Sequence, residues 1–501
     1  MTTSEALSYV TKVLEQVDLY RHASSLVQYD METVCPPQGM SRQGEVAAFL
    51  ANQAFRLMKD DAFVEAAEAL YKGREELGEF ERTLADKLHR DYLRTRRMTP
   101  EDQHEAARVA NQAYVDWLSA KEADDFSLFA HSLEEVRRVE MKSITLMDQA
   151  SPVAYDNLLD LYERGMTSAE LDRLFGACRE RLVPLLRKIM ASKKKIRRDF
   201  LTRPVTDLAQ EELAKYLLTT MGFDFSRGAL GTTEHPFTDG LGQFDERVTT
   251  NYDPNNFISS LYSVVHEGGH ALFDMNQPAE NWKYFITDLK TMGQHESVSR
   301  FYENRIGRSE AFLGLIYPKL KEVFPEVMAD VTPRELYEAV NIVEPSLIRT
   351  EADEFTYTFH IMIRYEIEKE IIKGNVNTAD LPKLWNDTYE AYLGVRPSGD
   401  REGILQDVHW TSGFGYFPTY ALGNMYNAMY YNRMKEELDI DKAVSEGRFD
   451  LINGWMREHV FKKADRLAPC DWIRDITGRD LTPDDFLDYL EKKYSAIYEL
   501  D

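Results

Sequence analysis

Cysteine and long apolar runs are both scarce in this chain. Three cysteines occur among 501 residues, at Cys35, Cys178 and Cys470, and no two form a Cys-x-x-Cys pair. This argues against a disulfide framework or a thiolate zinc site and predicts a cytoplasmic location. No stretch approaches the roughly 18 consecutive apolar residues of a transmembrane helix, so we expect no membrane span. The N-terminal segment lacks a basic stretch followed by an apolar one, so we also expect no signal peptide.

Positive charge is also in short supply. Lys and Arg number 60 against 85 Asp and Glu, which gives a formal net charge of −25. So much negative charge argues against a general partner for nucleic acid or anionic membranes. We interpret the one basic run, residues 193–198, as a solvated helix face. The 43% of hydrophobic residues indicates an ordinary globular protein rather than a disordered one.

The dominant sequence period is that of an α-helix. Residues 5–20 carry apolar side chains at helical spacing and predict an amphipathic helix. Helix starts are indicated by Thr-Pro pairs, because Thr caps free amides and Pro suits the first helical position. Thr167 and Glu170 have the spacing of a capping box. The Thr-Pro pairs are Thr99-Pro100, Thr332-Pro333 and Thr482-Pro483.

Residues 230–253 interrupt this helical pattern. The segment is rich in Gly, Thr and Asp, and its second half alternates in the way of a short strand. No internal repeat or long Pro/Gly/Ser linker appears. We therefore expect a mainly α-helical protein with a small β element, forming one unit over residues 1–501.

The sharpest local pattern is His266-Glu267-Gly268-Gly269-His270. Two histidines four residues apart share one face of a helix and can bind one zinc ion through their imidazoles. Glu267 lies beside the first and could take a proton from an activated water, as a general base. Glycines are costly inside a helix, so Gly268 and Gly269 suggest close approach by substrate or by a packed helix. The apolar run 257–265 supports a buried helix.

A catalytic zinc site needs a third protein ligand from another element. Glu296 is the best candidate, because it lies on a second helical stretch, residues 293–305, that a helix–loop–helix turn could bring back to His266 and His270. His295 points about 100° away from Glu296 on such a helix. We therefore expect His295 to contact a ligand or face solvent rather than bind metal.

Several further segments carry a family resemblance. They are Tyr29-Asp30-Met31-Glu32-Thr33 with Pro36-Pro37, His235-Pro236-Phe237, Asp245-Glu246-Arg247-Val248-Thr249, Ile348-Arg349-Thr350-Glu351-Ala352-Asp353, and Gly403 to Trp410. Together with the histidine pattern, they make the chain resemble the carboxypeptidase Taq family of zinc metallocarboxypeptidases. Two positions depart from the family pattern. Tyr29 stands where the family has Trp. Val298 stands where the family has an amide side chain near the third ligand, and the loss of this donor is expected to alter the surroundings of the metal site without removing the Glu296 ligand.

The resemblance implies a fold and an activity. The expected fold has two helical subdomains flanking a deep groove with zinc at its floor. The expected activity is release of C-terminal residues from peptides with broad specificity, poor on C-terminal proline. One Zn²⁺ per chain is expected, with Co²⁺ as a possible substitute, together with a homodimer. The alternative function is a zinc oligopeptidase that cuts internally near peptide ends. A non-enzymatic scaffold is disfavoured, because the three predicted ligands and Glu267 are all intact.

Other site residues follow from the same motifs. His409 and Tyr420 could donate hydrogen bonds to the oxyanion formed at the scissile carbonyl, although the aromatic residues of this loop could simply pack. Arg349 lies among apolar neighbours and needs an anionic partner. That partner is either Asp353 or the terminal carboxylate of a peptide. Arg247 is the second candidate anchor, and His235 could line the groove or be structural.

Overall fold

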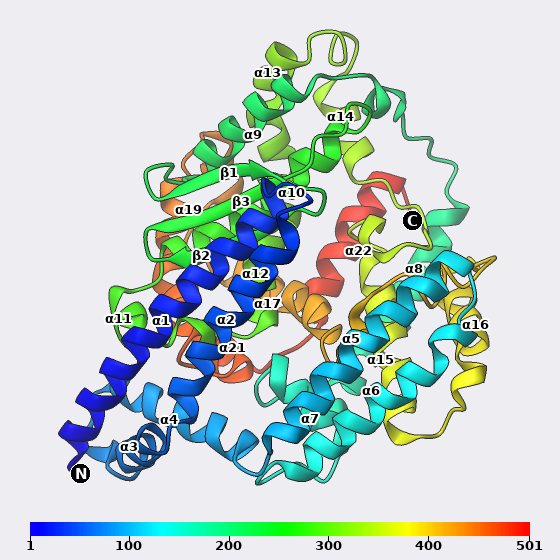
Figure 1. Cartoon of the computed structure of the whole chain (residues 1–501). Helices are drawn as coiled ribbons and strands as arrows, with labels where there is room; N and C mark the ends of the chain where they lie inside the picture. The colour runs from blue at the N-terminus through cyan, green and yellow to red at the C-terminus, as the bar shows by residue number, and fades with distance from the viewer. Residues whose placement is uncertain (501) are drawn as a thin grey trace.

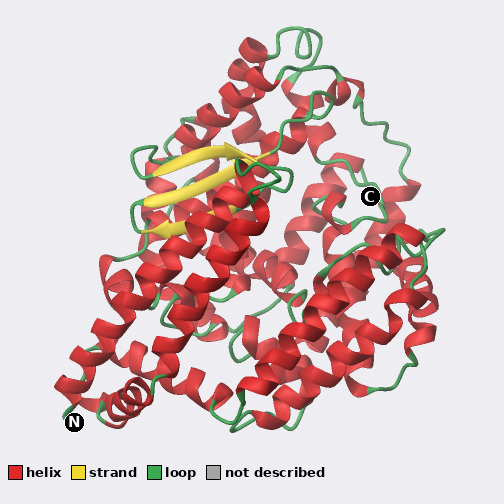
Figure 2. Cartoon of the chain, viewed as in Figure 1, coloured by secondary structure: helices red, strands yellow, loops and turns green. Residues whose placement is uncertain are grey.

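The computed structural model describes residues 1–500 and is helical apart from one small sheet (Figures 1 and 2). In Figure 1 the sheet and the N-terminal helices lie on one side of the molecule. Helices α5–α8, α15 and α16 lie on the other side, and α10, α12, α17 and α22 lie between them. Within the described residues, no helix has the length and apolar character needed to cross a membrane. The expected fold class, mainly α with a small β element, is confirmed.

The elements follow one another in a long helical series. The first half contains α1 (Thr3–Thr33), α2 (Met40–Lys59), α3 (Asp61–Lys72), α4 (Glu79–Thr95), α5 (Pro100–Ala123), α6 (Ser127–Leu146), α7 (Ala154–Tyr162), α8 (Ser168–Ala191), α9 (Asp207–Met221), β1 (Gly228–Thr232), β2 (Thr238–Gly242) and β3 (Asp245–Thr250). The second half contains α10 (Phe257–Met275), α11 (Ala279–Lys283), α12 (Met292–Arg300), α13 (Glu310–Val323), α14 (Pro333–Val340), α15 (Tyr357–Lys373), α16 (Leu381–Leu393), α17 (Pro418–Lys435), α18 (Ile440–Ser445), α19 (Phe449–Met456), α20 (Lys462–Ala464), α21 (Pro469–Thr477) and α22 (Asp484–Tyr498). Two π-helical segments, Phe301–Gly307 and Arg457–Phe461, extend α12 and α19.

The predicted helix caps hold at three of four sites. Thr99 and Thr332 each cap a helix that has Pro as its first residue. Thr167 caps α8, but the Glu170 carboxylate pairs with Arg173 instead of returning to the cap. The predicted start at Pro483 is wrong. The helix begins one residue later, because the Asp484 amide donates a hydrogen bond to the Thr482 hydroxyl and forms a local turn.

The sheet has three strands in the order β1-β3-β2. β1 pairs with β3 in parallel, and β2 pairs with β3 antiparallel. Glu246, Val248 and Thr250 of β3 are buried, while Arg247 is partly exposed. The sheet packs against α10, where the Thr250 hydroxyl lies 2.7 Å from that of Ser263. The β element predicted over residues 230–253 is therefore present, and it lies directly against the histidine-bearing helix.

Two clusters of buried apolar residues stabilise the chain. The larger one runs through the helices from α5 to α22, and the smaller one joins α1, α3 and α4 with Ala54 and Ile286. Ile286 lies in the connection between α10 and α12, so the N-terminal helices pack against a segment that links the two predicted ligand helices. The predicted division into two subdomains flanking a groove stays a prediction.

The basic run is not part of a helix. Helix α8 ends at Ala191, and residues 192–198 have no regular structure. The Arg197 guanidinium binds the carboxylates of Asp199 and Asp330, which offset its charge. Residues 193–198 are exposed or partly exposed, as predicted, but the predicted helix is wrong, because ion pairs with acidic side chains and not helical repeats organise this segment.

Candidate active site

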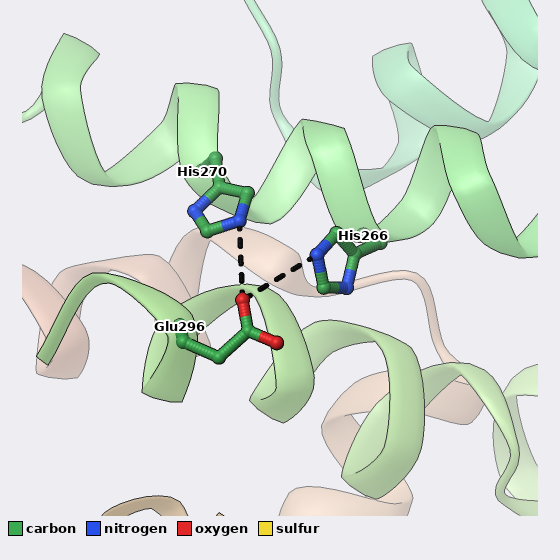
Figure 3. Close-up of side chains that lie close together, drawn as sticks. All are labelled: His266, His270 and Glu296. Carbon is green, nitrogen blue, oxygen red and sulfur yellow. Dashed lines mark ion pairs between the residues drawn. The ribbon is translucent and has the colours of Figure 1, made fainter. Parts of the chain in front are cut away.

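Helix α10 presents both predicted histidine ligands on one face. His266 and His270 are four residues apart, and the helix is otherwise almost completely buried. Asn256 caps its start by accepting a hydrogen bond from the Ser259 amide, and Asn276 ends it. The histidine Nε2 atoms point toward a single carboxylate oxygen from α12 (Figure 3).

That carboxylate belongs to Glu296. Its Oε2 lies 3.6 Å from Nε2 of His266 and 3.5 Å from Nε2 of His270. Ligands about 2 Å from a tetrahedral zinc ion lie roughly 3.3 Å apart, so the three atoms have the spacing of one metal-binding group. The donor set of two imidazoles and one carboxylate also suits zinc and leaves an open position. The residues therefore fit a divalent metal ion.

Close packing of three helices makes this convergence possible. A Cβ atom on Gly269 would lie 2.7 Å from the Ser299 Cα of α12, and one on Gly423 would lie 3.0 Å from the Ser297 amide nitrogen. A Cβ on Gly268 would lie 2.7 Å from a Leu218 methyl group. Of the two explanations open for Gly268 and Gly269, a packed helix is therefore the one observed. Any larger residue at 269 would push α12 and its glutamate away from the histidines.

Each ligand is held by a second polar group. Nδ1 of His266 lies 2.9 Å from Oε2 of Glu303, which fixes the imidazole so that Nε2 faces the cluster. Arg300 donates from Nε to Oε1 of Glu296 at 2.8 Å and from Nη1 to Glu303 at 3.1 Å. Glu303 lies in the π-helical segment that follows α12.

His270 is supported from a different direction. Its Nδ1 contacts Nδ1 of His295, and Nε2 of His295 lies 3.0 Å from the Asp274 carboxylate. Lys290 forms an ion pair with Asp274 at 2.9 Å. His295 therefore supports a ligand instead of joining the cluster, as the sequence predicts.

The charged groups around the predicted metal ligands shift the pKa values of Glu296 and His266. Burial alone would raise the pKa of Glu296, but the Arg300 guanidinium and His266 hold it well below its usual range. Burial would lower the pKa of His266, and the Glu296 and Glu303 carboxylates raise it instead. The carboxylate is thus ionised at neutral pH, as a metal ligand must be.

Glu267 points from the same helix toward the sheet. It is 8% exposed, and its Oε2 lies 2.7 Å from the Thr238 hydroxyl of β2. The same hydroxyl lies 2.9 Å from the Glu267 carbonyl oxygen. Edge strand β2 therefore fixes the position of the predicted general base, which explains why a small sheet lies against α10.

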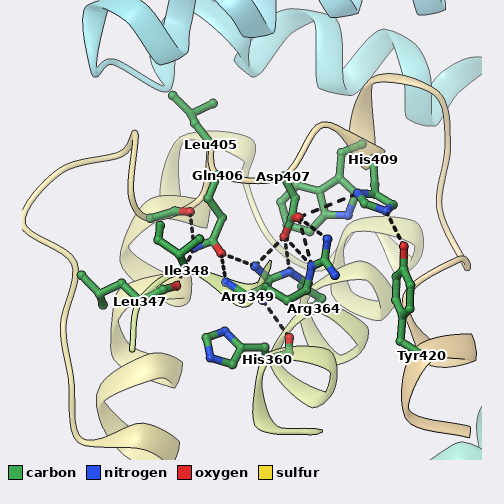
Figure 4. Close-up of polar contacts among 12 residues, drawn as sticks. Leu347, Ile348, Arg349, His360, Arg364, Leu405, Gln406, Asp407, His409 and Tyr420 are labelled. Atoms are coloured by element: carbon green, nitrogen blue, oxygen red, sulfur yellow. Dashed lines mark hydrogen bonds and ion pairs between the residues drawn. The ribbon is translucent and has the colours of Figure 1, made fainter. Parts of the chain in front are cut away.

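A second polar cluster surrounds Arg349 (Figure 4). Arg349 is 7% exposed and binds the Asp407 carboxylate through Nε at 3.0 Å and Nη2 at 2.8 Å. Arg364 binds the other oxygen of Asp407 at 2.6 Å. Two arginines thus share one carboxylate, which leaves these ion pairs with a net positive charge.

Of the two partners considered for Arg349, Asp353 is excluded by the structure. Residues Arg349–Glu351 form a single 3₁₀ turn and Ala352 is extended, so positions four apart do not share a helix face. Asp353 instead accepts hydrogen bonds from the backbone amides of Glu344, Phe355 and Thr356. The structural partner of Arg349 is Asp407, 58 residues further along the chain.

His409 and Tyr420 adjoin this cluster. Nε2 of His409 lies 3.3 Å from the Tyr420 hydroxyl, and the Arg349 guanidinium lies 5.0 Å from the centre of the Tyr420 ring. Burial lowers the pKa of His409 to about 4 and raises that of Tyr420 far above its usual value. After burial and the neighbouring tyrosines, the Glu296 carboxylate also raises the pKa of Tyr420.

Comparison with known proteins identifies the family. The sequence profile described as carboxypeptidase Taq (M32) metallopeptidase matches residues 9–494. Carboxypeptidase 1 of Bacillus subtilis is 38% identical over 97% of this chain and 98% of its own length. Thermostable carboxypeptidase 1 of Pyrococcus furiosus is 34% identical over 98% of this chain and 99% of its own. The chain belongs to the carboxypeptidase Taq family.

Solved structures agree with this assignment. The M32 carboxypeptidase of Deinococcus radiodurans superposes with a TM-score of 0.95 at 30% identity, over 99% of this chain and 100% of that one. A solved structure of Pyrococcus furiosus carboxypeptidase gives a TM-score of 0.94 at 34% identity, over 98% of this chain and 99% of that one. A carboxypeptidase Taq protein is a metallopeptidase, so this chain is a peptide hydrolase.

The family motifs of the N-terminal half meet in space. Tyr29 of α1 packs edge-on against Phe237, and the Arg247 guanidinium lies 5.3 Å from the centre of the Tyr29 ring. Arg247 also pairs with Asp245, while His235 is exposed in the connection between β1 and β2. Arg247 and Asp245 lie on β3, in the sheet that supports Glu267, and His235 lies in a loop of the same sheet. The substrate roles of Arg247 and His235 stay predictions.

Four supporting residues were missed by sequence reasoning. Arg300 and Glu303 had a detectable signal, because they follow Glu296 by four and seven residues on one helix face. Asp274 had the same kind of signal, because it follows His270 by four residues on α10. Thr238 carried none. Val298, the departure from the family pattern, is fully buried in the larger apolar cluster, and its carbonyl oxygen faces Gly269. Its side chain therefore contributes to the apolar core, and its backbone lies at the close contact between α10 and α12.

Proposed function

We propose that this carboxypeptidase Taq protein releases C-terminal residues from peptides, using one divalent metal ion held by His266, His270 and Glu296. The observation that carries the proposal is the convergence of two Nε2 atoms and one carboxylate oxygen beside Glu267. Zinc suits this donor set, and cobalt is an alternative occupant. When bound, the ion supplies Lewis-acid polarisation of the scissile carbonyl and lowers the pKa of a water molecule.

Glu267 is the proposed general base. It takes the proton from the attacking water and passes it to the leaving amine. The hydrogen bond from Thr238 holds one carboxylate oxygen and leaves the other free to accept that proton. Because the Glu267 side chain is buried, it keeps its orientation when no substrate is bound.

His409 and Tyr420 are the proposed donors to the developing oxyanion. Their shifted pKa values keep His409 neutral and Tyr420 protonated at pH 7, so each carries one donor hydrogen. The contact between them uses one of these hydrogens and must open before both groups can donate to an oxyanion. Donors aimed at the site where negative charge forms stabilise the transition state more than the substrate. The adjacent positive cluster of Arg349 and Arg364 adds to this effect.

Recognition of the substrate terminus is proposed to use Arg349, with Arg247 as the second candidate. The ion pairs of Arg349 and Arg364 with Asp407 lack one negative charge, which a terminal carboxylate would supply. Both candidate anchors already have a carboxylate partner in the chain, and this favours the alternative function, an oligopeptidase that needs no free terminus.

Matched peptides separate the two functions. The chelated protein is reloaded with zinc or cobalt and given peptides with a free or an amidated C-terminus. A carboxypeptidase cuts the free form far faster and releases single residues, whereas equal cleavage of both forms establishes the oligopeptidase. Poor cleavage before C-terminal proline, broad side-chain preference, a homodimer and a cytoplasmic location complete the proposal.

A further inference from the structure

The two oxygens of Glu296 have different surroundings. Oε2 faces Nε2 of both histidines, whereas Oε1 points away from them (Figure 3). Oε1 accepts a hydrogen bond from Nε of Arg300 at 2.8 Å. The Ser299 hydroxyl lies 3.2 Å from Oε2 but also donates to a backbone carbonyl at 2.8 Å. Arg300 therefore provides the strong contact to the outer oxygen.

Arg300 is itself fixed in place. Its side chain is 15% exposed, and Nη1 donates to Oε2 of Glu303 at 3.1 Å. Its guanidinium also lies 4.4 Å from the centre of the Tyr357 ring. The planar fork thus spans two carboxylates while lying near an aromatic ring, an arrangement that a lysine ammonium does not reproduce.

We propose that Arg300 is a positioning residue that reserves Oε1 of Glu296, so that this carboxylate offers a metal ion one oxygen and not two. A carboxylate that binds through both oxygens occupies an additional coordination position. Keeping Oε1 engaged therefore preserves an open position for water and the substrate carbonyl. The inference rests on the proposed function, because it concerns the metal held by the same three residues.

Cobalt loading of the full-length protein tests the proposal. Visible absorption by bound Co²⁺ is stronger at low coordination number, so it reports the number of ligands independently of activity. Arg300→Lys and Arg300→Met are compared with wild type after stoichiometric loading. We expect the molar absorptivity to fall about twofold and kcat to fall roughly 10- to 100-fold, with a smaller change in KM.

Arg308 provides a matched control. Its side chain is also 15% exposed, and its Nη2 donates to Oε1 of Glu303 at 3.3 Å, with no hydrogen bond to Glu296. Arg308→Met removes a similar buried charge, so its cobalt spectrum should match that of wild type. If Arg308→Met changes the spectrum as much as Arg300→Met does, loss of charge and not the reserved oxygen explains the effect, and the proposal is overturned.

The remaining outcomes are also decisive. A wild-type spectrum in cobalt-loaded Arg300→Lys and Arg300→Met overturns the proposal, even if metal affinity falls. If Arg300→Met does not fold, the lysine variant alone gives the answer, since it retains the positive charge. Failure of the wild-type protein to bind cobalt at all would overturn the proposed metal site itself, and with it this inference.

Discussion

Two buried polar clusters differ in what they direct at a ligand. The acceptor cluster, His266, His270 and Glu296, brings three electron-pair donors together around one point. The donor cluster, Arg349, Arg364, His409 and Tyr420, instead gathers groups that donate hydrogen bonds, with Asp407 as its one anionic partner in these ion pairs. The first suits a cation and the second an anion. This difference indicates a division of work between metal binding and stabilisation of negative charge.

Both clusters are supported by a buried carboxyl group behind them. Glu163 accepts a hydrogen bond from the Gly293 amide at the start of α12, 3.0 Å away. Glu368 accepts hydrogen bonds from Trp410 at 2.8 Å and from the Gly415 amide at 3.0 Å, in the loop between His409 and Tyr420. Burial raises the pKa of each carboxyl to about 7. Each cluster is thus held by one buried carboxyl group, although one cluster suits a cation and the other an anion.

Removing one member of the acceptor cluster should have the largest effect. His266→Ala deletes an imidazole ligand and leaves two donors, too few for a stable site. We expect bound metal, measured by elemental analysis, to fall from about one ion per chain to nearly none, and turnover to fall roughly 1,000-fold or more. Full metal content and activity in this variant would contradict the ligand assignment.

Glu267→Gln separates metal binding from chemistry. The amide keeps the shape of the side chain and its contact with Thr238, but it does not accept the proton of water. We expect normal metal content and a decrease in kcat of about 10²- to 10⁴-fold. Turnover close to wild type in the metal-loaded variant would show that another group is the base.

A matched change in the donor cluster should leave the metal untouched. Tyr420→Phe removes one hydroxyl donor, so kcat should fall by about 10²- to 10³-fold, with metal content unchanged. Single-turnover kinetics with a short peptide measure this step. Tyr431→Phe, a buried tyrosine further along the same helix, serves as the control. If both variants behave alike, Tyr420 only packs.

If Arg349 anchors the substrate terminus, its removal should reduce the preference for free over amidated peptides. We expect Arg349→Ala to lower kcat/KM on free peptides by a factor corresponding to about 2 kcal/mol, and to change it much less on amidated ones. If the variant keeps the preference for free termini, the anchor lies elsewhere, and Arg247→Ala is tested next.

The buried carboxyl behind the acceptor cluster should give the smallest effect, on stability. The pKa of Glu163 is raised from 4.5 to about 7 in the folded state, so the folded protein holds this proton more tightly than the unfolded chain. Stability from this group is present below pH 4.5 and is lost as pH rises through 7. Glu163→Gln should therefore reduce the loss of stability between pH 5 and pH 8 by about 1–3 kcal/mol in urea unfolding. An exposed control, Glu326→Gln, should show the wild-type pH dependence.

Much of the fold and the acceptor cluster was predictable because its signals are local. The helical period predicted the helices that the structure shows as α1 and α10, and the interruption at residues 230–253 predicted the sheet. Two histidines on one helix face need only a spacing of four residues. The start of α22 and the basic run at 193–198 were predicted wrongly, because a threonine turn and distant carboxylates decide those segments.

The sequence by itself determined the helical class, the family and the residue types of the site. The tertiary structure decided the partners: Asp407 and not Asp353 for Arg349, Thr238 for Glu267, and Glu303 with Arg300 for His266 and Glu296. The reason is physical. A periodic pattern reports which face of a helix is buried, whereas the ion pair that compensates a buried charge depends on which helices pack together. That packing is set here by glycines at 269 and 423: a side chain at 269 would collide with the backbone of α12, and one at 423 would be tightly confined against it.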